Sequence, residues 1–146
     1  MEKHEEAQKR FNAGFNCAQS VIGTFSPELG LDEASAMKIS SAFGGGINNM
    51  GKTCGAIAGA LMVIGMKYGK TEPIDVEKQA LVKHLSKEVI SKFRKRHGSI
   101  ECSELLGLDV TSRHQKPASE LYSNCPLFVG DVSKIVAKLI EEDFKE

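Results

Sequence analysis

Apolar residues recur at helical spacing along most of the chain. Between residues 11 and 25 they lie three to four positions apart, which predicts a first helix that stops near Ser26-Pro27. This stripe comprises Phe11, Phe15, Ala18, Ile22 and Phe25. Asp32, preceded by Leu31, can cap a second helix that runs to about Phe43 and is ended by Gly44-Gly45-Gly46.

The middle of the chain predicts a glycine-rich third helix. Thr53 can cap it, which places Cys54 at its first position and carries it to Tyr68, with Gly69 as the stop. The helix contains Gly55, Gly59 and Gly65. Each glycine weakens a helix by about 1 kcal/mol relative to alanine, so this helix must gain from close packing. We expect it to be the central helix.

The second half of the chain predicts three further helices. One opens at Pro73 or Asp75 and ends before Gly98, and its stripe comprises Ile74, Leu81, Val82, Leu85, Val89 and Phe93. Ser99 caps a short helix that continues through Leu106 and is closed by Gly107. Residues 108–130, with Pro117 and Pro126, are the least regular part, and the last helix opens at Gly130-Asp131.

No segment shows the alternation of a half-buried strand. The expected architecture is therefore all-α, a single compact bundle of about five or six helices, with residues 1–146 forming one domain.

Charge and hydropathy exclude several classes of partner. Nineteen basic residues balance nineteen acidic ones, so we expect no binding of nucleic acid. The basic run Arg94–His97 fits a helix end, where cations are favoured. The charged N-terminus carries no secretory signal, and the apolar stretch from Ala56 to Met66 is shorter than the ~20 residues of a membrane helix. We expect a cytoplasmic protein without membrane insertion, and assembly into a homo-oligomer stays open.

The four cysteines are the main chemical signal. Cys17, Cys54, Cys102 and Cys125 lie far apart, and none forms a Cys-x-x-Cys pair. In a reducing cytoplasm such cysteines serve catalysis, redox sensing or metal binding more often than structural disulfides. The alternative is that some are small buried apolar residues.

The segments around these cysteines resemble a known family. They are Gly14–Val21 (GFNCAQSV), Thr53–Gly59 (TCGAIAG), Ile100–Gly107 (IECSELLG) and Asn124–Pro126 (NCP). In order and local context they are similar to the four cysteine stations of the C-GCAxxG-C-C family, although this chain reads Cys-Gly-Ala where the family name has Gly-Cys-Ala. The resemblance implies thiol redox chemistry or a cysteine-held cofactor, and it supplies no substrate.

Cys54 is the candidate attacking thiol. A helix N-terminus lowers a thiol pKa because its backbone N–H groups are unpaired, and Lys52 could add positive charge. Cys102, in a first turn beside two glutamates, fits a resolving partner or a ligand. Cys17, in the middle of the first helix, and Cys125, on an irregular segment, could reach the same point. The redox partner, protein or small molecule, remains unknown.

A cofactor is the second hypothesis. Four cysteines can hold an iron-sulfur cluster or a zinc ion, although such ligand sets usually include a close pair, which is absent here. None of the histidines is expected to be a ligand; they are His4, His84, His97 and His114. No metal ligand is therefore assigned, and the identity of any cofactor stays unknown.

A third motif competes with the thiols. Residues 46–53 (GINNMGKT) match the Walker A pattern letter for letter, but the segment before them predicts a helix rather than the buried strand that a P-loop follows. A weaker form of this hypothesis is that backbone amides around 44–52 bind an anion or cofactor beside Cys54. The residues expected at such a site are Gly51, Lys52, Gly55 and Gly59.

Overall fold

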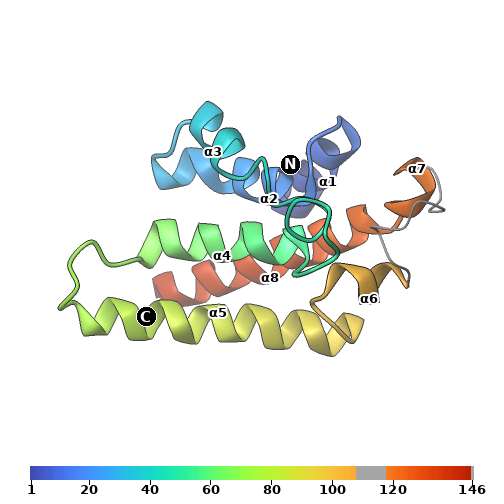
Figure 1. The fold of residues 1–146 in the computed structure, drawn as a ribbon. Helices are drawn as coiled ribbons and strands as arrows, with labels where there is room; N and C mark the ends of the chain where they lie inside the picture. Colours follow the sequence, from blue (N-terminus) through green and yellow to red (C-terminus); the bar gives the residue numbers. More distant parts are fainter. Residues whose placement is uncertain (108–117, 146) are drawn as a thin grey trace.

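The regular elements of the chain are helices, as predicted. The structure, a computed structural model, describes residues 1–107 and 118–145. The helices are α1 (Lys3–Asn12), α2 (Cys17–Phe25), the 3-10 helix η1 (Ser26–Leu29), α3 (Glu33–Ile39), α4 (Gly55–Tyr68), α5 (Val76–His97), α6 (Cys102–Leu106), α7 (Ala118–Leu121) and α8 (Cys125–Lys145) (Figure 1). In this described part of the chain, no helix is both long and apolar enough to cross a membrane. His114 and Pro117 lie outside the described residues.

The first predicted helix is two helices. The chain turns at Gly14, whose φ of 116° is open to glycine and strained for other residues. The Asn16 side chain then accepts a hydrogen bond from the Gln19 amide, and the Gln19 side chain accepts one from the Asn16 amide, which completes a capping box. The prediction that Cys17 lies in the middle of a helix is therefore wrong, because Cys17 is the first residue of α2.

The helix caps on either side of residues 44–52, which connect α3 to α4, were predicted in part. Asp32 caps α3 through the amide of Ser35, as expected, but α3 ends at Ile39 and turns follow it. Helix α4 begins at Gly55, so Cys54, and not Thr53, occupies the N-cap position. Thr53 instead pairs with Glu101 in an isolated antiparallel bridge.

Helix α4 is central, as its glycines predicted. It contacts α2, α5 and α8, and Figure 1 shows it between α2 and α5. A Cβ atom placed on Gly59 would come within 2.8 Å of the Ala18 carbonyl oxygen, and one on Gly55 would come within 3.0 Å of the Cys17 Cβ. These two glycines therefore let the α2 backbone approach α4 closely.

The two long helices complete the core. Asp75 caps α5 through the amide of Lys78, but Ile74 lies before this cap and is 85% exposed, so it does not belong to the apolar stripe. Helix α8 begins at Cys125, five residues earlier than predicted. A proline in the first turn of a helix loses no intrahelical hydrogen bond, so Pro126 fits within the first turn of this helix, directly after Cys125.

Candidate functional site

The four cysteines meet where four helices begin. Cys17, Cys102 and Cys125 are the first residues of α2, α6 and α8, and Cys54 is the N-cap residue of α4. All four are buried free thiols. Together they line a single cavity of about 10 Å³. The convergence that sequence spacing left undecided is thus present in the fold.

A short antiparallel contact brings Cys54 next to Cys102. The Cys54 amide donates to the Ile100 carbonyl over 2.7 Å, and the Cys102 amide donates to the Lys52 carbonyl over 2.6 Å. These bonds flank the bridge between Thr53 and Glu101. The segment that starts α4 is therefore fixed against the segment that starts α6.

Cys17 and Cys125 form the second close contact. The Cys17 thiol donates a hydrogen bond to the Cys125 sulfur, which favours the thiolate of Cys125. This bond lowers the pKa of Cys125 and raises that of Cys17 well above its ordinary value; burial raises the pKa of Cys17 further. Among the described cysteines, Cys125 is the one whose pKa is lowered.

The prediction of a lowered pKa at Cys54 is wrong. Burial raises its pKa to about 11, and the backbone amides of Ala56 and Ile57, which act in the opposite direction, do not compensate. Burial is also the main reason that the pKa of Cys102 rises to about 12. Sequence showed the helix N-terminus correctly, but it could not show that the loss of water around the sulfur is the larger effect.

The cavity between the thiols is too small for a cluster. About 10 Å³ is roughly the space that one water molecule needs. In residues 1–107 and 118–145, no group of three or more cysteine, histidine or carboxylate side chains is arranged to hold a metal ion. The cavity between the thiols therefore does not fit an iron-sulfur cluster.

The Walker-like loop packs over the cysteines. Turns and helix α3 precede it rather than a strand. Its amides at Gly51 and Lys52 donate to the carbonyls of Gly45 and Gly46, so these two amides are engaged within the loop. A Cβ atom on Gly46 would lie 2.6 Å from that of Cys102. These contacts favour a packing role for the loop over the anion site proposed at Gly51 and Lys52.

Tyr122 is the site residue that sequence reasoning missed. It lies between α7 and α8 and lines the cavity together with the cysteines. Burial raises the pKa of its hydroxyl, and the hydroxyl lies 3.5 Å from Asn49 Oδ1. Its position depends on how α8 and the loop meet, for which the sequence carries no local signal.

The buried thiols make the reduced protein sensitive to alkali. The pKa of Cys54 is about 11 in the folded protein against an ordinary value of 9.0, so the unfolded chain loses this proton first. The free energy of unfolding of the reduced protein should therefore fall as the pH rises from ~9 through ~11. Urea unfolding at several pH values measures this fall, and Cys54→Ala should make it shallower. An unchanged slope in Cys54→Ala would contradict the assignment.

Comparison with known proteins agrees with this geometry. No curated protein and no solved structure gives a significant match to the chain. The profile of one family, described as "Putative redox-active protein (C_GCAxxG_C_C)", matches residues 15–139, a range that contains all four cysteines. The chain therefore belongs to the C_GCAxxG_C_C family.

Proposed function

We propose that the protein is a thiol-disulfide redox protein whose four cysteines work as two dithiol pairs. The outer pair is Cys17 and Cys125, and the inner pair is Cys54 and Cys102. The observation that carries this proposal is the convergence of four buried thiols on one small cavity. Structural packing alone gives no reason for four cysteines to gather at the starts of four helices.

The outer pair is suited to start the reaction. Two hydrogen-bonded thiols titrate as a unit. The first proton of the pair is lost at a lowered pKa and the second at a raised pKa. The thiolate is the form that attacks a disulfide. The pair can give two electrons to a partner disulfide and become a disulfide itself.

The inner pair can restore the outer pair by exchange. Cys54 and Cys102 line the same cavity as Cys17 and Cys125. An exchange in which both inner thiols lose their protons and form a disulfide returns both outer cysteines to thiols. In this proposal Cys54 attacks the Cys17–Cys125 disulfide of the same chain, and Cys102 then attacks Cys54 to resolve the mixed disulfide. The roles of attacking and resolving thiol are those that the sequence predicted. A cytoplasmic location, also expected from the sequence, keeps the thiols reduced between reactions.

Oxidation of the purified protein tests the two pairs. Stepwise addition of diamide should remove all four thiols, and mapping of unreduced peptides should find the bridges Cys17–Cys125 and Cys54–Cys102. Cys17→Ser should abolish the first bridge and leave the second. If the protein as isolated carries stoichiometric iron or zinc and forms neither bridge, the cofactor hypothesis replaces this proposal.

A further inference from the structure

A larger pocket reaches the thiols from the outside. It has a volume of about 460 Å³, which lies within the usual range for a small-molecule site. Cys17, Gly45 and Tyr122 line both this pocket and the small cavity between the cysteines. Of the four cysteines, Cys17 is the one that lines the pocket. A molecule in the pocket would therefore meet Cys17 first.

The lining of the pocket is uncharged. Its walls combine the aromatic rings of Phe11, Phe15 and Tyr122 with glycines, an alanine and uncharged polar residues, and no described residue in the lining carries a charge. The polar residues are Asn16, Ser41, Asn48 and Asn49. Several polar groups there are already engaged. The Asn16 side chain caps α2 and donates to the carbonyls of Ser40 and Ser41. An ionised ligand would lose water here without gaining a countercharge in the lining.

We propose that this pocket binds an uncharged organic disulfide that carries an aromatic ring, and that Cys17 is the residue that attacks it. The inference rests on the proposed thiol-disulfide function and adds the substrate class and the entry point. The aromatic walls can stack on the ring, because offset and edge-to-face ring contacts are favourable. The shared residues Gly45 and Tyr122 place the attacked sulfur at the boundary between pocket and cavity.

The reaction balances with the groups that are present. In this reaction Cys17 starts as the thiol and Cys125 as the thiolate. Cys17 Sγ attacks one sulfur of the substrate while its proton passes to Cys125 Sγ, the substrate S–S bond breaks, and the other substrate sulfur leaves as a thiolate. That thiolate takes the proton from Cys125, whose sulfur then attacks Cys17 and releases the second half of the substrate. The products are the Cys17–Cys125 disulfide, one thiol and one thiolate. Two electrons pass from the protein to the substrate.

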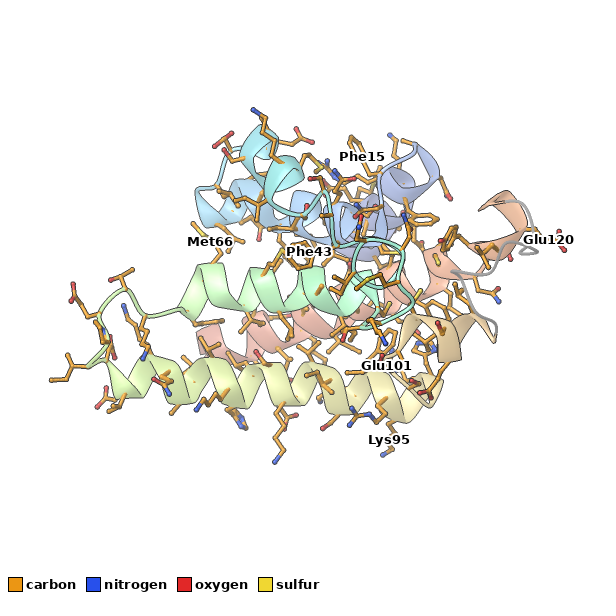
Figure 2. All side chains as sticks on the ribbon, in the orientation of Figure 1. Phe15, Phe43, Met66, Lys95, Glu101 and Glu120 are labelled. Atoms are coloured by element: carbon orange, nitrogen blue, oxygen red, sulfur yellow. The ribbon has the colours of Figure 1, made fainter. Side chains whose placement is uncertain are left out.

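Phe15 offers a direct way to change the charge of the pocket. It lies in the connection between α1 and α2, lines the pocket and is 38% exposed, so a substitution there disturbs little of the core. Met66, also exposed, is near the far end of α4 and lies outside the pocket lining (Figure 2). Figure 2 shows the two side chains well apart, which makes Met66 a matched control.

The test compares two aromatic disulfides on the reduced protein. Dithiodipyridine is uncharged and dithiobis(nitrobenzoate) carries two negative charges. For each state of the protein, the rate with dithiodipyridine is divided by the rate with dithiobis(nitrobenzoate). This ratio should be larger for the folded protein than for the urea-unfolded protein by about tenfold or more. Phe15→Arg should lower this preference by about tenfold, whereas Met66→Arg should leave it unchanged. Ala42→Lys, a second change in an exposed lining residue, should act like Phe15→Arg.

The outcomes separate the inference from the proposed function. If the Cys17–Cys125 bridge forms but the rate ratio of the two reagents is the same in folded and unfolded protein, the binding of an uncharged disulfide in the pocket is wrong. The redox function would then remain in place. First labelling at a cysteine other than Cys17, found by peptide mapping, would also overturn it. If neither reagent yields a bridge in the wild-type protein, the redox function and the inference both fail.

Discussion

Replacing Cys125 with serine is expected to slow the reaction of Cys17 with an aromatic disulfide by about 100-fold at pH ~7. The Cys125 sulfur accepts the hydrogen bond of the Cys17 thiol. In the proposed reaction it is the group that takes the Cys17 proton. Loss of a positioned base typically costs a factor of about 10²–10⁴ in rate. A serine hydroxyl fills almost the same space but does not hold a negative charge at this pH. Stopped-flow absorbance with dithiodipyridine measures the rate.

Cys54→Ser is the matched control for this prediction. It removes another thiol from the same cavity but leaves the Cys17–Cys125 hydrogen bond in place. The rate at Cys17 should then change by less than about threefold, since a factor of three corresponds to well under 1 kcal/mol. If Cys54→Ser instead abolishes the reaction and Cys125→Ser does not, the attacking thiol is Cys54, as the sequence alone indicated.

The second large effect concerns the contact between α2 and α4. Gly59→Ala should lower the free energy of unfolding by about 1–2 kcal/mol net, because its Cβ would come within 2.8 Å of the Ala18 carbonyl oxygen and 3.0 Å of the Val21 Cβ. Overpacking against a backbone atom is expected to cost about 2–3 kcal/mol, which exceeds the gain of about 1 kcal/mol that alanine brings to a helix. Urea unfolding of the reduced protein gives the difference.

Gly65→Ala makes the same chemical change in the same helix. A Cβ atom on Gly65 meets no other atom within 4 Å, so this variant should be more stable than wild type by about 0.5–1 kcal/mol. Equal changes in the two variants would show that α2 does not pack on Gly59. Because Cys17 is the first residue of α2, a shift of α2 in Gly59→Ala should also reduce the fraction of protein in which diamide forms the Cys17–Cys125 bridge.

Local signals were sufficient where a helix has its own caps. Asp75 and Gly98 mark the ends of α5 in the sequence, and in the structure they are its N-cap and its left-handed C-cap. Gly107 is likewise the left-handed C-cap of α6, but the prediction that Ser99 caps the start of this helix is wrong, because α6 begins at Cys102 and its N-cap residue is Glu101. A carboxylate that accepts from a backbone amide, and a glycine that takes a positive φ, act within a few residues, so their effect can be predicted without the fold.

Local signals failed at Cys17 and Cys125. The apolar stripe from Phe11 to Phe25 continues in register across the turn at Gly14, so periodicity concealed the start of α2. Pro126 was one reason to predict an irregular segment before Gly130, yet a proline is equally compatible with the first turn of α8. In both cases the local sequence is compatible with two conformations, and packing against the other helices selects one.

Local features of the sequence were sufficient to predict the helical class, the central position of the glycine-rich helix and the resemblance of the four cysteine segments to one family. These features follow from side-chain periodicity, small residues and residue identity, all of which act locally. The folded structure was needed to show that the thiols meet, which of them are neighbours, and that burial outweighs the helix N-terminus at Cys54. A thiol pKa depends on water and charges within a few ångströms, and those neighbours come from segments that are distant in the chain.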